Sequence, residues 1–267
     1  MTVSNIIVGK RSYLSSNLKT NFKNFGVISL NNFDKKKFKK KYKNAKINFI
    51  INHFYPIKKI NNKNTKIFLT KSIKEILSFL NYIKDFKVNK IILSSSSAVY
   101  GRNKKKLDFN RANYGKAKFE CEQIVKKFCK KQKCFYSICR IFNMYGGKDK
   151  SSVVYKIISA IKNKKKFKLV NYGNSERDFI NVQDVSEVYV KLLNINKSEI
   201  MDLGTGKSTK IKDIIDILSP NYIGTIHIKN KISELSNSVA KKNIQSTRLK
   251  KKKFIKLEDF LKKNIKI

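Results

Sequence analysis

Short apolar runs alternate along the chain with longer segments whose apolar residues recur every three or four positions. The short runs have the length and the β-branched content of buried strands, and they lie at residues 5–9, 27–30, 47–52, 90–93 and 135–140. The longer segments predict helices, the clearest at residues 14–22, 65–84 and 114–131. Strands that alternate with helices indicate a parallel sheet with helices on its faces. The predicted fold class is therefore α/β, a Rossmann-like doubly wound parallel sheet with a small C-terminal lobe.

Lysine dominates the composition. Of 267 residues, 61 are Lys or Arg and 18 are Asp or Glu, which gives a formal net charge of +43. Only six of the basic residues are arginine, whereas surfaces that read nucleic acid favour arginine forks. We therefore expect no specific nucleic-acid partner and interpret the lysines mainly as the codon usage of an AT-rich genome. The positive field would still draw an anionic substrate toward a cleft.

A strand that ends in four serines is the most informative stretch. The apolar run at 90–93 leads directly into the serines at 94–97. Ligands of open α/β sheets bind at the carboxyl ends of strands, so these hydroxyls are expected near a ligand. The next predicted helix starts at Tyr114, and Lys118 lies on the same face because it follows four positions later. The sequence thus predicts that a serine hydroxyl, a phenol and an ammonium converge at one strand end.

These three groups can together take a proton from an alcohol. A phenol has a pKa near ~10, too high for a base at neutral pH. An ammonium about 4 Å away contributes roughly 4 kcal/mol at an effective dielectric constant of ~20, enough to lower the phenol's pKa by up to ~3. The serine hydroxyl can hold the substrate oxygen while the phenolate takes its proton, and hydride can then leave the same carbon for a nicotinamide.

The first predicted strand ends in a glycine turn at Gly9. Strand, glycine turn and helix in this order begin a dinucleotide-binding unit. The usual fingerprint has two more glycines, and here Ser12 and Ser15 stand in their places. We expect Ser12 to narrow the backbone's approach to a pyrophosphate and Ser15 to crowd the helix against the strand. Dinucleotide binding is therefore weakened in principle and not excluded.

Three motifs resemble one known family. Ser-Ser-Ala-Val-Tyr-Gly at 96–101, followed by Tyr-x-x-x-Lys at 114–118, resembles the extended short-chain dehydrogenase/reductases of the NAD-dependent epimerase/dehydratase type, which act on nucleotide sugars. Residues 173–185 resemble the family's Gly-x-x-x-Arg-Asp-Phe-Ile-His-Val-x-Asp-Val, with Asn181 in the place of the histidine. Residues 140–146 resemble its Arg-x-Phe-Asn-x-Tyr-Gly. The resemblance extends over about residues 5–250.

The resemblance implies a role for particular residues. Ser96 would orient the substrate oxygen, Tyr114 would be the acid/base, and Lys118 would tune Tyr114 and hold the nicotinamide ribose. The implied cofactor contacts are Gly9, Ser12, Tyr13, Leu14, Asn31, His53, Ser94, Tyr114 and Lys118. The implied substrate contacts are Ser96, Ser97, Asn143 and Arg177, with the Arg177 guanidinium suited to a diphosphate.

The choice between NAD and NADP stays open. Asn31 stands where an acid would hold an adenosine ribose, and the lysines at 35–37 could meet a 2′-phosphate.

The function that the resemblance implies is NAD(P)-dependent hydride transfer at C4 of a nucleotide-diphosphate sugar, of the epimerase type. In an epimerase the 4-keto sugar turns and takes hydride back on its other face. A 4,6-dehydratase needs an acid/base pair just after the catalytic hydroxyl, where this chain has Ser97 and Ala98, so that activity is disfavoured. The alternatives are an NADPH-dependent 4-keto-sugar reductase and a non-catalytic Rossmann-like binding protein.

Residues 1–145 are expected to form mainly the NAD(P)-binding Rossmann domain, and residues 146–267 its remaining elements plus a small substrate-binding lobe. No metal site is predicted, because the two histidines are far apart and the four cysteines form no C-x-x-C pair. No apolar run approaches the ~18 residues of a membrane span, and with no signal peptide the chain is predicted to be cytoplasmic. The resemblance also implies a homodimer formed through the helix that carries Tyr114.

Overall fold

The computed structural model describes residues 3–30, 33–52, 65–101, 109–147, 150, 152–219, 224–228, 237–241 and 253–265. The chain divides into two compact units. The first unit comprises Met1–Lys104, Phe109–Arg140 and Ser186–Met201, and the second comprises Lys105–Asp108, Ile141–Val185 and Asp202–Ile267.

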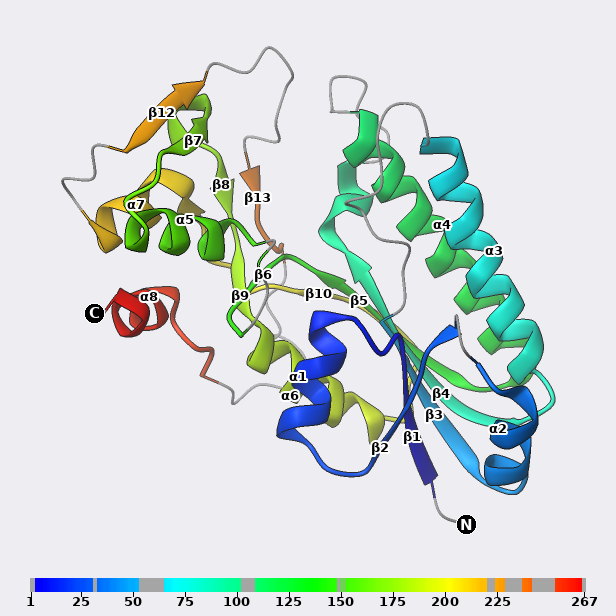
Figure 1. Cartoon of the computed structure of the whole chain (residues 1–267). Coiled ribbons are helices and arrows are strands. Elements are labelled where there is room, and N and C mark those ends of the chain that lie inside the picture. Colours follow the sequence, from blue (N-terminus) through cyan, green and yellow to red (C-terminus); the bar gives the residue numbers. More distant parts are fainter. Residues whose placement is uncertain are drawn as a thin grey trace. The chain divides into compact units, whose positions relative to one another are not determined.

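A six-stranded sheet organises the first unit (Figure 1). Its order is β10 (Glu199–Leu203), β5 (Phe135–Ile141), β4 (Lys87–Ser96), β3 (Lys46–Ile51), β1 (Val3–Val8) and β2 (Phe25–Ile28). β1 pairs in parallel with β2 on one side and with β3 on the other. The chain thus leaves β1 in one direction for β2 and returns to its other side for β3. This reversal confirms the predicted doubly wound fold, in which ligands typically bind at the carboxyl ends of the strands beside the reversal, here β1 and β3.

Helices cover both faces of this sheet. They are α1 (Tyr13–Asn21), α2 (Lys35–Tyr42), α3 (Thr65–Ile83), α4 (Phe109–Gln132) and α6 (Val182–Leu193). Alternate strand residues such as Ile6, Phe49 and Ile91 form one core with α2, α3 and α4. The residues between them face the opposite side, where Figure 1 shows α1 beside α6, and Ser186 of α6 donates a hydrogen bond to Asn17 of α1 at 2.7 Å. Both faces are buried, which is why the strands are continuous apolar runs.

The lysine-rich helix α2 packs on the core through Phe38 and Tyr42. Asp34 caps its first turn by accepting a hydrogen bond from the Lys37 N–H at 2.9 Å. Phe38 is buried against Phe49 and Phe86, whereas the lysines of the helix are exposed. The lysines of α2 therefore form a solvated face.

In its described residues, the second unit contains small sheets, three complete α-helices and the 3₁₀ helix η4 (Asn171–Gly173). Its elements are β6 (Asn143–Tyr145), α5 (Val153–Lys162), β7 (Phe167–Val170), β8 (Glu176–Arg177), β9 (Phe179–Asn181), β11 (Thr209–Lys210), α7 (Ile211–Leu218), β12 (Thr225–Ile228), β13 (Asn237–Ser238) and α8 (Leu257–Ile265). β6 pairs with β9, β7 with β12, and β8 with both β11 and β13. Tyr145, Ile214 and Leu261 are central residues of its core. In the described part of the chain, no helix is both long and apolar enough to cross a membrane.

Asp178 joins the segments of the second unit. Its buried carboxylate accepts hydrogen bonds from the Thr205 N–H and hydroxyl, each at 2.7 Å, and from the Gly206 N–H at 2.8 Å. The Ala240 N–H, at 3.2 Å, is a fourth donor. One carboxylate therefore satisfies backbone donors from two segments that are distant in sequence, which makes Asp178 a structural residue.

We expect Asp178→Ala to lower the free energy of unfolding by about 3–5 kcal/mol, because the N–H groups of Thr205, Gly206 and Ala240 and the Thr205 hydroxyl lose a buried acceptor. Urea denaturation measures this loss. Asp216→Ala, at an exposed position of α7, is the control and should change stability by less than about 0.5 kcal/mol. Equal effects of the two substitutions would show that Asp178 does not hold the unit together.

Candidate active site

The catalytic hydroxyl predicted by the sequence lies at the carboxyl end of β4. Ser96 is the last residue of this strand, and the chain continues into the 3₁₀ helix η3 (Ser97–Gly101). The Ser96 hydroxyl oxygen accepts a hydrogen bond from the Ala98 N–H at 3.2 Å and makes a side-chain hydrogen bond with Tyr114 of α4. The strand end and the helix thus bring the predicted serine and phenol into direct contact.

Lys118 completes the group of three. Its side chain is 6% exposed, and Nζ donates a hydrogen bond to the Ser94 carbonyl at 2.8 Å. Nζ also lies 5.9 Å from the centroid of the Tyr114 ring. The helical spacing of four and the end of the strand therefore bring all three predicted groups together, as the sequence indicates.

The protonation of this pair differs from the sequence-based expectation. Burial raises the pKa of Tyr114 to about 12, and the hydrogen bond with Ser96 lowers it only in part. Burial also lowers the pKa of Lys118 to about 8, against the opposing effects of Cys121 and Glu122. The sequence predicts a lowered pKa for this phenol, whereas the net shift is upward, because the cost of burying a phenolate exceeds the help from its surroundings.

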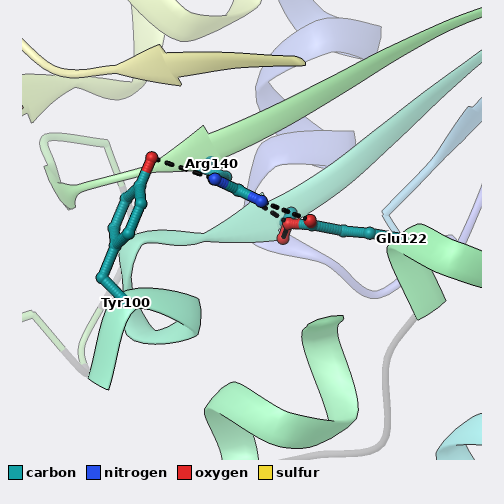
Figure 2. Close-up of polar contacts among 4 residues, drawn as sticks. Tyr100, Glu122 and Arg140 are labelled. Carbon is teal, nitrogen blue, oxygen red and sulfur yellow. Dashed lines mark hydrogen bonds and ion pairs between the residues drawn. The ribbon is translucent and has the colours of Figure 1, made fainter. Parts of the chain in front are cut away.

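A buried carboxylate lies one helical turn beyond Lys118 (Figure 2). Glu122 is 0% exposed, and its Oε1 accepts from the Ser95 hydroxyl at 2.5 Å and from Arg140 Nε at 3.0 Å. Oε2 accepts from Arg140 Nη2 at 2.7 Å. Arg140 Nη1 in turn donates to the Tyr100 hydroxyl at 3.0 Å. The hydrogen bond with Glu122 keeps the pKa of Arg140 above its usual range.

This network fixes the surroundings of Ser96. Ser95 precedes Ser96 on β4, Tyr100 belongs to η3 just after it, and Glu122 belongs to the helix of Tyr114. A two-pronged contact with Arg140 of β5 therefore ties α4, β4 and η3 to one another. The sequence analysis assigned no role to Glu122. Its only local signal is an acidic residue four positions after Lys118 in a helix rich in lysine.

The turn after β1 keeps the glycine that its backbone needs. Gly9 has φ +107°, a conformation that disfavours side chains, and its N–H donates to the Ile28 carbonyl at 2.9 Å. Ser12 begins α1 with φ −67° and ψ 137°, which any residue adopts. The first glycine is therefore required by conformation, and the backbone at Ser12 accepts serine without strain.

The other predicted cofactor residues lie at the start of α1 or outside the described residues. The Leu14 side chain is buried and that of Tyr13 half-buried. Ser15 is 2% exposed, and its hydroxyl oxygen accepts a hydrogen bond from Asn52 Nδ2 at 3.1 Å. The expected crowding by Ser15 is thus replaced by a polar contact. Asn31 and His53 are the two that lie outside the described residues.

The predicted substrate residues are distributed over both units. Ser97 is half-buried in η3, beside Ser96 in the first unit. Asn143 in the second unit donates from Nδ2 to the Asp178 carbonyl at 3.1 Å. Arg177, also in the second unit, is 7% exposed and donates from Nη1 to the Glu176 carbonyl at 2.8 Å. Among the described residues, no group of three or more His, Cys, Asp and Glu is placed to hold a metal ion.

Comparison with known families agrees with the resemblance seen in the sequence. The model of the NAD dependent epimerase/dehydratase family matches residues 4–204. The chain belongs to this family. The expected family membership, with its Rossmann-type sheet, is confirmed.

Individual relatives of this family member are distant. A protein of Methanocaldococcus jannaschii assigned as a UDP-glucose 4-epimerase is 30% identical over 153 residues, 53% of this chain and 50% of that protein. A UDP-glucuronate 4-epimerase of Thermodesulfobacterium geofontis is 27% identical over 164 residues, 58% of this chain and 51% of that protein. The matches therefore cover about half the length of these curated relatives.

Solved structures match this family member over nearly its whole length. A variant of UDP-glucuronic acid 4-epimerase from Bacillus cereus, in complex with UDP-4-deoxy-4-fluoro-glucuronic acid and NAD, gives a TM-score of 0.82 at 18% identity and covers 99% of this chain and 98% of its own. UDP-N-acetylglucosamine 4-epimerase from Methanobrevibacter ruminantium, in complex with UDP-N-acetylmuramic acid, gives a TM-score of 0.78 at 20% identity. This match covers 98% of this chain and 97% of that protein's chain. At these identities the likeness is one of fold.

Replacing Glu122 tests the network of Figure 2. We expect Glu122→Ala to lower the free energy of unfolding by about 3–5 kcal/mol, because the Arg140 charge and the Ser95 hydroxyl lose their buried acceptor. Glu120→Ala, at an exposed position of the same helix, should change stability by less than about 0.5 kcal/mol in the same urea titration. Similar losses in both variants would contradict the structural role of Glu122.

Because the pKa of Lys118 is lowered in the folded protein, the free energy of unfolding should depend on pH through this residue. Between the folded pKa of about 8 and the ordinary value of 10.5, the unfolded chain binds more protons at this residue. The contribution of Lys118 to stability should therefore rise with pH across this window, by about 3 kcal/mol in total.

The measurement is urea unfolding of the wild type and of Lys118→Met at several pH values from 7 to 10.5. The free energy of unfolding of the wild type, relative to that of Lys118→Met, should increase as pH rises. Lys116→Met, at an exposed position on the same helix, should show a difference that does not depend on pH. A constant difference for Lys118→Met would exclude a lowered pKa.

Proposed function

We propose that this protein catalyses NAD(P)-dependent epimerisation at C4 of a nucleotide-diphosphate sugar. The observation that carries the proposal is the contact of Ser96 with Tyr114 and the placement of Lys118 beside them at the carboxyl end of β4. Family membership supports it, and so do the names of the two solved neighbours, both UDP-sugar 4-epimerases.

Each residue of the group has one task. Ser96 holds the C4 oxygen of the sugar by hydrogen bonding. Tyr114 takes the proton of that oxygen and later returns it. Lys118 presents its ammonium beside the phenol and is itself oriented by the Ser94 carbonyl. Because Lys118 is almost fully buried, its charge acts with little screening from water.

The residues at the ends of β1 and β4 fit a nicotinamide dinucleotide. Gly9 keeps the positive φ that the tight turn requires, and α1 begins four residues later, so a helix N-terminus, which favours a pyrophosphate, follows the turn. Bound there, such a cofactor would supply hydride-transfer chemistry, and in its oxidised form it would carry a positive charge that favours the phenolate of Tyr114. In the proposal, Ser12, Tyr13, Ser94 and Lys118 also contact it.

The substrate is proposed to be a UDP-sugar or a related nucleotide sugar. Both neighbouring structures contain UDP-sugars. We assign Asn143 to the nucleotide sugar and Arg177 to its diphosphate, since a guanidinium pairs well with phosphate oxygens. The net charge of +43 favours the approach of such an anion.

A 4-keto-sugar reductase is the second candidate, and the raised pKa of Tyr114 favours it. At neutral pH a phenol with a pKa of about 12 carries its proton. A protonated phenol is the form that donates a proton to a ketone during reduction, whereas oxidation of an alcohol needs the phenolate.

Replacing Tyr114 by Phe tests the proposed acid/base. We expect kcat for interconversion of C4-epimeric UDP-sugars to fall by about 10²- to 10⁴-fold, while NADH binding, followed by fluorescence, changes little. Tyr136→Phe on β5 is the matched control and should retain wild-type turnover.

The outcomes separate the candidates. Turnover that survives in Tyr114→Phe would refute the assignment of Tyr114. Consumption of NADPH with a 4-keto sugar, without interconversion of epimers, would establish the reductase instead. Absence of NAD(P)H binding even at millimolar concentration would leave a non-catalytic binding protein.

Two further features belong to the proposal. The four cysteines are free and buried, which fits a reducing compartment, and we place the protein in the cytoplasm. Dimerisation through α4, the helix of Tyr114, stays a prediction.

A further inference from the structure

Asn52 lies where the sheet reverses direction. It follows β3 directly, and its N–H donates to the Val8 carbonyl at 2.9 Å, so it stands beside the end of β1 and the Gly9 turn. This is the reversal point of a doubly wound sheet, at which ligands bind. The backbone of Asn52 is thereby fixed, and its side chain projects from a defined place.

The side chain of Asn52 joins two elements of the proposed site. Nδ2 donates to the Ser15 hydroxyl oxygen of α1 at 3.1 Å. Oδ1 accepts a hydrogen bond from the Ser94 hydroxyl of β4. The same Ser94 holds the Lys118 ammonium through its carbonyl at 2.8 Å. A continuous set of hydrogen bonds therefore runs from the dinucleotide turn to the proton-transfer group.

Ser15 gives the Asn52 amide, through its hydroxyl, an acceptor that a glycine could not supply. It stands at the third position of the glycine fingerprint, yet its side chain is 2% exposed and its hydroxyl is paired with Asn52. A buried hydroxyl without a partner would be costly, and a glycine at this place would leave the Asn52 amide without this acceptor. Ser15 and Asn52 thus form a pair in which each residue satisfies the other.

Ser94 has a second side-chain partner besides Asn52. Its hydroxyl lies 2.8 Å from the hydroxyl of Tyr189 on α6. The Ser94 side chain is thus restrained by partners on α6 and at the end of β3, while its carbonyl accepts the hydrogen bond from Lys118. Loss of Asn52 would release one of these two side-chain restraints.

We propose that Asn52 is a positioning residue that couples the dinucleotide-binding helix α1, through Ser15, to the strand end that orients Lys118, through Ser94. The inference rests on the proposed function. In it, the Ser15–Asn52 pair holds the helix close to the sheet, at the position where the family has a glycine. Loss of the pair should weaken cofactor binding without removing any group that touches the sugar.

The test is a double-mutant cycle of Asn52→Ala and Ser15→Ala. Each single variant is expected to weaken NADH binding about tenfold by fluorescence titration. The double variant should bind NADH no more weakly than the single variant with the lower affinity, because both substitutions remove the same link. The KM for the cofactor should rise in parallel, while the KM for the sugar stays within about twofold. The urea midpoint of the protein without cofactor should show the same non-additivity.

Asn48→Ala is the matched control. Asn48 lies on the same strand, is more buried than Asn52, and also bridges two neighbours, donating to Asn5 Oδ1 at 2.9 Å and accepting from Asn89 Nδ2 at 2.7 Å. It lies four residues earlier, about 13 Å away along the strand. Its replacement should lower the urea midpoint and leave NADH affinity at the wild-type value.

The results distinguish the inference from the function beneath it. Normal NADH binding by Asn52→Ala, or fully additive losses in the cycle, would overturn the coupling while leaving the proposed function intact. If the wild type binds neither NADH nor NADPH, the proposed function fails and the inference fails with it. Equal loss of NADH affinity in Asn48→Ala would show a general effect of stability and would also overturn the inference.

Discussion

At the carboxyl ends of β3 and β4, buried and half-buried polar side chains leave the sheet in one layer. Asn52, Ser94 and Ser95 all lie in this layer, and each is hydrogen-bonded to a residue from a different helix or strand. A buried polar group without a partner costs more than a hydrogen bond gains, so these pairings restrict how α1, α4 and α6 can dock. The arrangement of the candidate site follows from this requirement. Glu122 is its central acceptor, and Asn52 both donates and accepts a hydrogen bond.

The damaged glycine fingerprint illustrates how a motif can change while its physical function persists. The conformational demand falls on Gly9 alone, because only there is φ strongly positive in this turn. At Ser12 the backbone is extended, and at Ser15 the demand is for close packing, which a small side chain with a hydrogen-bonding partner can also meet. The departure from three glycines is therefore a weaker argument against cofactor binding than the sequence alone makes it.

The protonation of Tyr114 and Lys118 links the structure of the site to the direction of its chemistry. Burial works against both charged forms, raising the pKa of the phenol and lowering that of the ammonium. A nearby charge can reverse this only if it exceeds the desolvation cost. Under the proposed function, the balance between epimerisation and reduction thus depends on which charges lie beside Tyr114.

The sequence by itself determined the α/β class, the order of most helices and strands, and the convergence of Ser96, Tyr114 and Lys118. These features are local: periodicity sets each element, the end of a parallel strand sets the place of Ser96, and helical spacing sets Lys118 beside Tyr114. Only the tertiary structure decided the pairs Ser15–Asn52 and Glu122–Arg140, and the direction in which the pKa of Tyr114 moves. Those features depend on which distant segments meet in space and on how much water they exclude, and neither quantity is encoded in the spacing of residues along one segment.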